Sequence, residues 1–212
     1  MPKGGCVEAN HIEGSRLWSA KGRNGTAELL EIIADGADNR VPSSARSILD
    51  VLARQYSAIG AESGSIDKSI LAWHRACEAS RRLAEIPGIG PIVATALVAE
   101  IGDWTAFASG RNLAAWIGLV PTQHTTGGKD RLGSITKQGN RYLRWLLVVG
   151  ATAVIRYAQK HGTKNRPWLA RLMERRPAKV AAVALANKIA RIAWAIMVRG
   201  DRYKEPTILM AA

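Results

Sequence analysis

The sequence has little cysteine and few aromatic residues. Its two cysteines, Cys6 and Cys77, match neither a metal-binding spacing nor a disulfide framework. This usage fits a reducing compartment, and we expect a cytoplasmic protein. The chain has seven Trp, four Tyr and one Phe, so Ala, Leu, Ile and Val supply most of its 47% hydrophobic content. Such a composition favours a mainly helical fold.

The sequence also lacks an apolar run after its opening "MPKGG", so no signal peptide is predicted. Two later apolar stretches are poor candidates for membrane spans. "WLLVVGATAVI" is too short, and "VAAVALANKIARIAWAIMV" contains Lys188 and Arg191. We therefore expect no membrane partner.

Acidic residues are scarce in the C-terminal third. Residues 129–205 contain 18 Lys and Arg but four Asp and Glu, whereas the rest of the chain has 12 basic and 13 acidic residues. The whole net charge of +13 therefore lies in this third. A basic excess this localised predicts a polyanionic partner, most often a nucleic acid, although a solubilising face would have the same composition.

Four parts are predicted along the chain: an irregular lead-in (1–23), a helical coiled-coil segment (24–79), a helical domain (80–205) and a tail (206–212). The coiled-coil segment has a heptad pattern, broken at Ser63, with a weak point at Gly60–Gly64 where the helix could kink or break. The pattern predicts a homo-oligomer through this seam or, alternatively, packing within the chain. The seam residues are Leu49, Leu52, Tyr56, Ile59, Ser63, Ile66, Ile70, Trp73 and Cys77.

The stretch "RRLAEIPGIGPIVATALVAEIGD" joins two apolar helical segments through Pro87, Gly88, Ile89 and Gly90. This is a helix-hairpin-helix pattern, in which glycines let backbone N–H groups approach a phosphate at the second helix's N-terminus. Simple packing of the turn is the alternative interpretation. We predict that these four residues bind a nucleic acid backbone.

Helix ends are marked elsewhere by capping residues. We expect an N-cap at Asn24 or Thr26 with a stop at Gly36, and a helix from Ser109 to Gly118. A long core helix should open with Pro177 and stop at Gly200. In this core helix Lys179, Lys188 and Arg191 should reach a surface or a groove.

The stretch "TQHTTGGKDRLGSITKQGN" has little apolar content and should form a long polar loop or a distorted hairpin. Basic side chains in and after it could neutralise a phosphate, and two glycines would allow close backbone approach. The predicted nucleic-acid-binding residues here are Gly127, Gly128, Lys129, Arg131, Lys137, Arg141 and Arg144. The expected fold is thus mainly α, with a long heptad-patterned helix, a helix-hairpin-helix-containing bundle and one long polar loop.

The order of these segments resembles the C-terminal transposase domain of the insertion-sequence-110 family, particularly its insertion-sequence-1111 branch. The resemblance covers about residues 25–204. It implies a recombinase that moves a DNA element, with DNA and a structured RNA as partners. It also implies an N-terminal RNase-H-like domain with four acidic metal ligands, a C-terminal hydroxyl nucleophile that is normally Ser, and a coiled coil that supports oligomerisation.

The sequence departs from this family pattern in two ways. No strand with Asp in an "IGID"-like context is present, so we expect a truncated member with no metal ligands, which would meet Mg²⁺ only through the missing acidic domain. The nucleophile position falls on Thr126, with Thr125 adjacent and Ser134 as a local alternative. These hydroxyls could instead satisfy loop backbone groups. His124 could assist a proton transfer or be incidental.

The predicted function is therefore DNA transposition by a fragment that is inactive on its own. A non-catalytic nucleic-acid-binding module and a decayed fragment without function are the alternatives.

Overall fold

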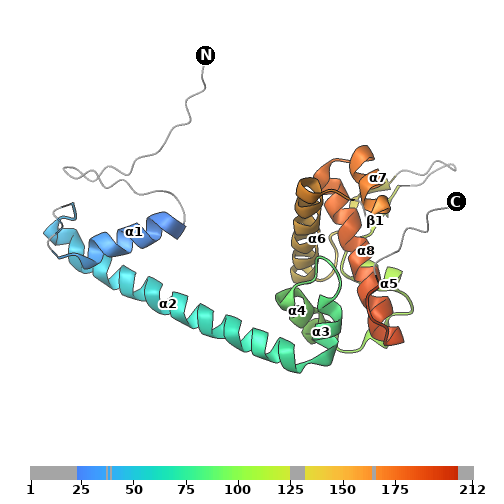
Figure 1. Ribbon diagram of the computed structural model, residues 1–212, viewed down its shortest axis with the longest axis horizontal. Coiled ribbons are helices and arrows are strands. Elements are labelled where there is room, and N and C mark those ends of the chain that lie inside the picture. The colour runs from blue at the N-terminus through green and yellow to red at the C-terminus, as the bar shows by residue number, and fades with distance from the viewer. Residues whose placement is uncertain (1–22, 37, 39, 125–131, 164–165, 205–212) are drawn as a thin grey trace, which may run out of the picture. The chain divides into compact units, whose positions relative to one another are not determined.

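The computed structural model describes residues 23–36, 38, 40–124, 132–163 and 166–204 (Figure 1). These residues form eight α-helices, one short 3-10 turn and a two-stranded antiparallel sheet, which confirms the mainly α fold class. The chain divides into two compact units, residues 1–67 and 68–212. The elements are α1 (Arg23–Ala34), α2 (Ser43–Ala76), α3 (Glu78–Ala84), α4 (Pro91–Ile101), η1 (Trp104–Ala106), α5 (Gly110–Trp116), β1 (Pro121–Gln123), β2 (Leu132–Ile135), α6 (Arg141–His161), α7 (Pro167–Arg175) and α8 (Ala178–Arg199).

In the first unit, Arg46 of α2 holds the end of α1. Its Nη1 donates to the carbonyl oxygens of Ile33 (3.3 Å) and Asp35 (2.8 Å), and its Nη2 donates to that of Asp38 (2.5 Å). A helix end leaves its last carbonyls without partners inside the helix, and this guanidinium satisfies acceptors there. α1 ends before Gly36 as predicted.

The predicted N-cap of α1 was wrong. The helix begins at Arg23, so both Asn24 and Thr26 lie inside it rather than at its start. Capping residues mark where a helix can begin, but the helical hydrogen bonds extend further upstream here.

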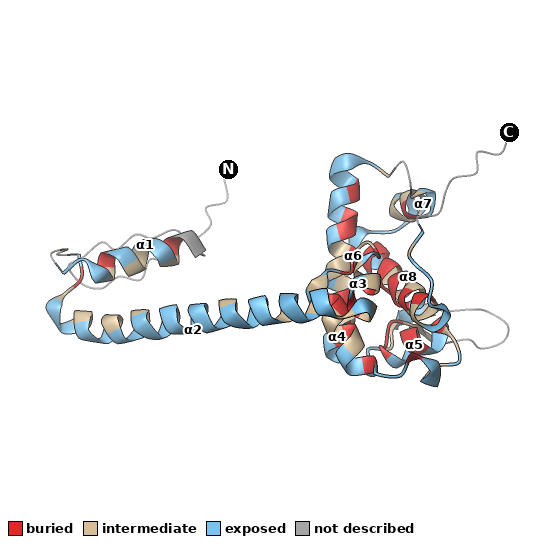
Figure 2. Cartoon of the chain, turned by 60° about the horizontal axis from the view of Figure 1, so that its bottom comes forward, coloured by how far each residue is buried: buried red, intermediate tan, exposed pale blue. Residues whose placement is uncertain are grey.

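α2 is continuous through Gly60 and Gly64, so the possible break in the heptad helix is absent. A Cβ added at either glycine would have no atom within 4 Å. No residue of α2 is buried, and its surface is exposed or half-buried throughout (Figure 2). The helix ends at Ala76, one residue before the last predicted seam position.

In the second unit, α8 is the central helix and contacts α3, α5, α6 and α7. It begins after Pro177 and ends at Gly200, whose φ of 74° is the left-handed conformation that glycine adopts readily. By length and composition α8 could also cross a membrane, and 39% of its apolar stretch is buried within the protein. Its buried residues are mostly small and allow close helix contact: Ala181, Ala182, Leu185, Ala186, Ile189, Ala190, Ala193 and Ile196.

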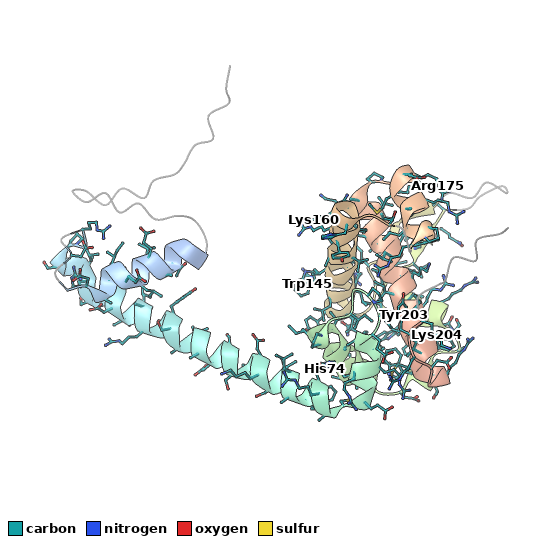
Figure 3. The ribbon with its side chains drawn as sticks, viewed as in Figure 1. His74, Trp145, Lys160, Arg175, Tyr203 and Lys204 are labelled. Carbon is teal, nitrogen blue, oxygen red and sulfur yellow. The ribbon has the colours of Figure 1, made fainter. Side chains whose placement is uncertain are left out.

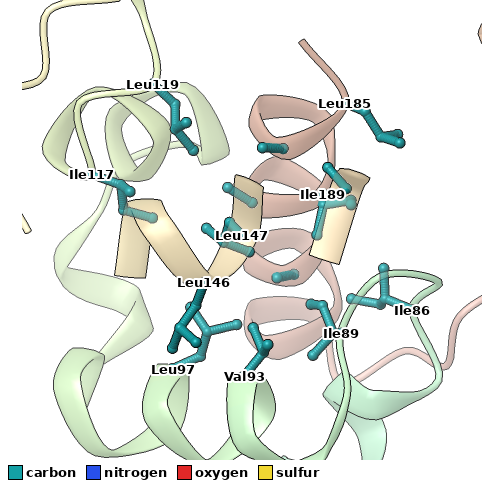
Figure 4. Close-up of a cluster of buried hydrophobic side chains, with 14 of the residues drawn as sticks. Ile86, Ile89, Val93, Leu97, Ile117, Leu119, Leu146, Leu147, Leu185 and Ile189 are labelled. Carbon is teal, nitrogen blue, oxygen red and sulfur yellow. The ribbon is translucent and has the colours of Figure 1, made fainter. Parts of the chain in front are cut away.

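Larger side chains from α4 and α6 fill the core beside α8 (Figure 4). Leu97, Leu143 and Leu147 are completely buried. Truncating one such leucine to alanine typically costs about 2–5 kcal/mol of folding stability. This packing fixes α6, which carries Arg141 and Arg144, and the segments between the helices, where the other described site residues lie.

Ser80 is the one buried polar side chain among the described residues, and it has a partner. Its hydroxyl lies 2.7 Å from Nδ1 of His74. The bond joins the end of α2 to α3 and avoids the cost of burying an unpaired hydroxyl.

The long polar segment forms an irregular hairpin, one of its two predicted forms. β1 pairs antiparallel with β2, with Pro121 opposite Ile135 and Gln123 opposite Leu132. The register shifts between these two pairs. Residues 125–131, between the strands, lie outside the described residues.

Candidate nucleic-acid interface

Two glycines bring the ends of the hairpin into backbone contact. Gly118 and Gly139 have φ values of 80° and 91°. A Cβ at Gly118 would lie 2.0 Å from the carbonyl oxygen of Gln138, and one at Gly139 would lie 1.8 Å from that of Trp116. Only glycine accommodates both the conformation and the contact. The base of the hairpin is therefore rigidly built.

Arg144, on the first turn of α6, reinforces this base. Its Nη1 donates to the carbonyl oxygens of Ile117 (2.8 Å) and Gln138 (3.4 Å), and the residue is half-buried. We predicted a phosphate contact for Arg144 from its charge. The structure gives this arginine a role in holding the two sides of the hairpin base together, so any phosphate contact would have to use its other nitrogens.

Lys137 and Arg141 are exposed at the same base. Lys137 has φ 55°, an unfavourable conformation for a residue with a Cβ, and its N–H donates to the Gly118 carbonyl (3.3 Å). Arg141 begins α6 directly after Asn140. The Asn140 side chain accepts from the N–H of Leu143 (3.0 Å) and donates to Glu100 of α4 (2.8 Å). Two cations thus project from fixed backbone.

The other predicted residues of this segment lie outside the described residues. They are Thr125, Thr126, Gly127, Gly128, Lys129 and Arg131. Their nearest described neighbours along the chain are His124, directly after β1, and Leu132, the first residue of β2. His124 and Ser134 are both exposed, and Thr122 donates its hydroxyl to the Ser134 carbonyl (3.0 Å). A Cβ at Gly133 would lie 2.4 Å from Thr122 Oγ1, so a side chain at Gly133 would require Thr122 to shift.

The residues of the PGIG turn, 87–90, differ in whether they pack on the core or are exposed. Gly88 has φ 96° and packs on the core, where a Cβ would lie 3.0 Å from Ile189 and 3.2 Å from the Gly150 carbonyl. Ile89 is buried, and its N–H donates to the Ile86 carbonyl (2.9 Å). Gly88 and Ile89 thus pack within the fold, and their contact with a nucleic acid backbone stays a prediction.

Gly90 differs from Gly88 because the fold does not require a glycine there. It is exposed, has an ordinary φ of −85°, and would meet nothing within 4 Å if it carried a Cβ. It is the N-cap of α4, with Pro91 at the first helical position as predicted. An open glycine before a helix leaves the backbone N–H groups accessible, which a bound phosphate would need.

The structure does not join the PGIG turn and the hairpin base into one site. The turn packs against Gly150, whereas the hairpin base adjoins Arg141 at the start of the same helix. Nine residues of α-helix correspond to about 14 Å. The two candidate contacts are therefore separated along α6.

Sequence reasoning missed a pocket of about 800 Å³ in the second unit. The pocket is lined by residues of α7 and α8, by Ile86 and Pro87, and by residues 199–204. Because these residues come from different parts of the chain, no single stretch of sequence indicates the pocket. The one signal was Lys188, which was expected to reach a surface or groove and does line this pocket.

The described residues contain no group of three or more His, Cys, Asp or Glu that could hold a metal ion. The catalytic Mg²⁺ that the resemblance implies therefore finds no ligand set in the described part of the chain.

Comparison with known proteins shows what the second unit is similar to. Residues 80–166 match the Transposase IS116/IS110/IS902 family.

Individual relatives are similar to this chain over more than residues 80–166. A Sinorhizobium fredii protein named as transposase y4pF/y4sB is 43% identical over 93% of this chain and 52% of its own length. A Pseudomonas aeruginosa protein named as a family 20 transposase is 42% identical over 94% of this chain and 60% of its own. The transposase for insertion sequence element IS1111A of Coxiella burnetii is 38% identical over 84% and 48%. The chain thus spans about half to three-fifths of these relatives.

Proposed function

We propose that this chain acts in DNA transposition, as the nucleic-acid-binding and nucleophile-bearing part of a recombinase of the insertion-sequence-1111 branch. The hairpin base carries the proposal, because two glycine contacts and Arg144 fix the strands that flank residues 125–131 while Lys137 and Arg141 stay exposed. The match of residues 80–166 and the similarity to the IS1111A transposase support it.

Thr126 is the proposed nucleophile, with Thr125 and Ser134 as the alternatives. The Thr126 oxygen would attack a DNA phosphorus atom, forming a phosphoester while the bond from phosphorus to one strand oxygen breaks. That oxygen would take up a proton and leave as a hydroxyl. The β-methyl of threonine restricts χ1, so the fixed hairpin base would help to align the attack.

Lys137 and Arg141 would neutralise phosphate charge near this loop, together with Lys129 and Arg131. The N-terminus of α4, through Gly90, would hold a second part of the backbone in the manner of a helix-hairpin-helix. DNA is the proposed partner, with a structured RNA as an additional one. Mg²⁺ would be supplied by an acidic domain other than the described residues.

α2 is the proposed oligomer contact, and residues 24–79 would form a coiled-coil segment before a domain over residues 80–205. Leu52, Tyr56, Ile59 and Ile66 of the heptad seam are each more than half exposed. Apolar surface gains about 25 cal/mol per Å² when it leaves water, so a second copy of the helix would stabilise this seam. We propose a cytoplasmic homo-oligomer.

The test is a salt titration of DNA binding. Lys137→Gln/Arg141→Gln removes two cations from the hairpin base. Arg156→Gln/Lys160→Gln is the matched control, because it removes two exposed cations from the far end of the same helix. Figure 3 shows Lys160 there. The slope of log affinity against log salt should fall by about 1.8 in the first variant, at about 0.9 per phosphate contact, and less in the control.

Equal effects of the two double variants would show diffuse attraction without a site at the hairpin. An affinity that does not change with salt would contradict nucleic-acid binding altogether. A non-catalytic binding module would give the same salt dependence, so only the nucleophile variants described below separate it from a recombinase.

A further inference from the structure

The pocket beside the PGIG turn has an apolar floor. Ile86, Val154, Leu185, Ile189 and Ile196 contribute to it, from the end of α3, from α6 and from α8. Two aromatic side chains line the same pocket: Trp168 at the start of α7 and Tyr203 in the segment after α8. A hollow of this kind suits a flat, largely apolar group.

The pocket walls are strongly basic. Five cationic residues line it, against one carboxylate, Asp201, among the described residues. The five are Arg166, Lys188, Arg199, Arg202 and Lys204. An apolar floor with this charge complements a ligand that joins a flat ring to a negative group. Figure 3 shows Tyr203 and Lys204 beside α8.

Lys188 links the apolar and basic parts of the pocket. Its ammonium lies 4.1 Å from the centroid of the Trp168 ring. Burial lowers the pKa of Lys188, and nearby Arg191 lowers it further. A bound anion would relieve both effects, because it would offset the lost hydration and the repulsion between the two cations.

The wall formed by residues 200–204 is anchored. The N–H of Tyr203 donates to Glu85 Oε2 (3.2 Å), and Arg202 Nη1 lies 3.7 Å from Glu85 Oε1. Glu85 directly precedes Ile86 and Pro87, which also line the pocket. The wall is thus fixed to the start of the PGIG turn.

We propose that this pocket binds an unpaired nucleotide of a single-stranded nucleic acid segment. The base would lie on the apolar floor against Trp168 and Tyr203, and its phosphates would face the surrounding arginines and lysines. The site is distinct from the hairpin base and from the N-terminus of α4. The proposal rests on the proposed function only because both require the chain to bind nucleic acid.

The shape and chemistry of the pocket favour an unpaired nucleotide over a duplex. Bases in a duplex are stacked on their neighbours, so a duplex presents mainly phosphates and groove edges to a protein surface. An apolar floor with aromatic side chains would have no function for such a ligand. An unpaired base exposes its ring faces, and stacking on an aromatic side chain stabilises it regardless of sequence.

The experiment compares two probes on the full chain by fluorescence anisotropy: labelled dT12 and a 12-base-pair duplex without unpaired ends. The variants are Trp168→Leu, which keeps an apolar side chain, and Lys188→Gln. The matched controls are Trp145→Leu and Lys160→Gln, because Trp145 and Lys160 are exposed on α6 outside the pocket (Figure 3). Thermal unfolding of each variant checks that the fold is kept.

We expect Trp168→Leu to weaken dT12 binding by about 5- to 140-fold, the range for loss of one base–aromatic stack, while duplex affinity changes by less than about twofold. Lys188→Gln should also weaken dT12 more than duplex. Both controls should leave the dT12-to-duplex ratio unchanged. With 5-iodouracil in the oligonucleotide, ultraviolet crosslinks should map to Trp168 or Tyr203.

Three outcomes would overturn the pocket proposal. Loss of dT12 and duplex binding by the same factor in the pocket variants would indicate general attraction. A second outcome is that Trp168→Leu leaves dT12 binding unchanged while Lys137→Gln/Arg141→Gln still reduces duplex binding. This result would contradict the pocket proposal and leave the proposed function intact. Absence of binding to either probe by the unmodified chain would overturn both.

Discussion

Gly150 of α6 lies directly against the backbone of Gly88 in the PGIG turn. A Cβ added at Gly150 would fall 1.9 Å from the Gly88 carbonyl oxygen and 3.0 Å from its carbon. Real Cβ atoms do not approach backbone this closely, so the turn or the helix would have to move. The glycine on α6 therefore determines how closely the turn packs.

We expect Gly150→Ala to destabilise the second unit by about 1–3 kcal/mol, the usual cost of overpacking a core, because the obstacle is backbone rather than a flexible side chain. Urea unfolding followed by tryptophan fluorescence measures this. Gly60→Ala and Gly64→Ala on α2 are the controls, since each has open space and should gain about 0.5–1 kcal/mol of helix stability. Equal effects at all three positions would contradict the packing assigned to Gly150.

At Lys137 we expect folding stability and DNA affinity to respond differently to substitution. The left-handed conformation costs a residue with a Cβ about 1–2 kcal/mol, whereas glycine avoids this cost but loses more entropy on folding. Lys137→Gly should therefore be neutral or stabilising by up to about 1 kcal/mol, and yet bind DNA more weakly because a cation is lost.

Lys137→Asn separates the two effects, since asparagine tolerates the left-handed region but carries no charge. It should match Lys137→Gly in affinity. Chemical denaturation and DNA anisotropy provide the two measurements. A Gly variant that is clearly less stable and binds as tightly as the unmodified chain would show that Lys137 serves the fold alone.

Much of the fold was predictable because helix ends depend on local chemistry. Ser109 accepts from the N–H of Asn112 at the start of α5, and Pro91, Pro177 and Gly200 stand where their backbone preferences place them. These signals involve residues a few positions apart. Sequence alone therefore predicted the order of the helices, and it left a long polar loop or a distorted hairpin as the two forms of the polar segment.

What the sequence could not give were contacts between distant segments. The charge of Arg144 suggested a phosphate, but nothing local shows that Ile117, 27 positions earlier, presents a carbonyl to it. The contact of Lys188 with Trp168 depends in the same way on how α7 packs on α8. Tertiary packing decides which cations serve the fold and which face a partner.

The heptad seam predicts a second copy of the chain. Ile66→Asp/Ile70→Asp would place two charges in the seam, where burial without a partner is costly, and should dissociate the oligomer. Ala61→Asp/Ala72→Asp is the control, because it adds the same charge to exposed positions of α2 off the seam. Sedimentation velocity measures both. A monomeric unmodified chain would contradict the seam's role.

Asp103 predicts a dependence of stability on pH. Hydrogen bonds from the Thr105 hydroxyl (2.6 Å) and the Thr105 N–H (2.9 Å) lower the pKa of Asp103 below its ordinary 3.8. A carboxylate with a lowered pKa stabilises the fold above its unfolded pKa, and this contribution is lost as the pH falls through the folded pKa.

Asp103→Asn keeps an acceptor at this position but removes the charge. The unmodified chain should therefore have a higher melting temperature than this variant at pH 6. The difference in melting temperature should disappear on acidification below about pH 3.8. Thermal unfolding between pH 6 and 3 measures it. A difference that stays constant over this range would show that the charge of Asp103 does not contribute.

This chain on its own should not join DNA strands. A hydroxyl without a base or a metal to activate it stays protonated and weakly nucleophilic near neutral pH. The described residues hold no carboxylate cluster for a cation. Adding the acidic domain of a longer relative, in the same chain or in a mixed oligomer, should allow covalent protein–DNA product to form. Denaturing gel electrophoresis of labelled DNA detects that product.

In that mixed setting Thr126→Ser should keep or raise the yield, because serine retains the hydroxyl and loses the β-methyl that restricts χ1. Thr126→Ala should abolish the product, while Ser134→Ala, at an exposed hydroxyl on β2, should leave it. The reverse pattern would make Ser134 the nucleophile. Product that survives both alanine variants and Thr125→Ala would show that none of these three hydroxyls is the nucleophile, whereas absence of product from the unmodified chain with the acidic domain would favour the non-catalytic binding module. Strand joining by the unmodified chain alone in magnesium buffer would show that the acidic domain is not required.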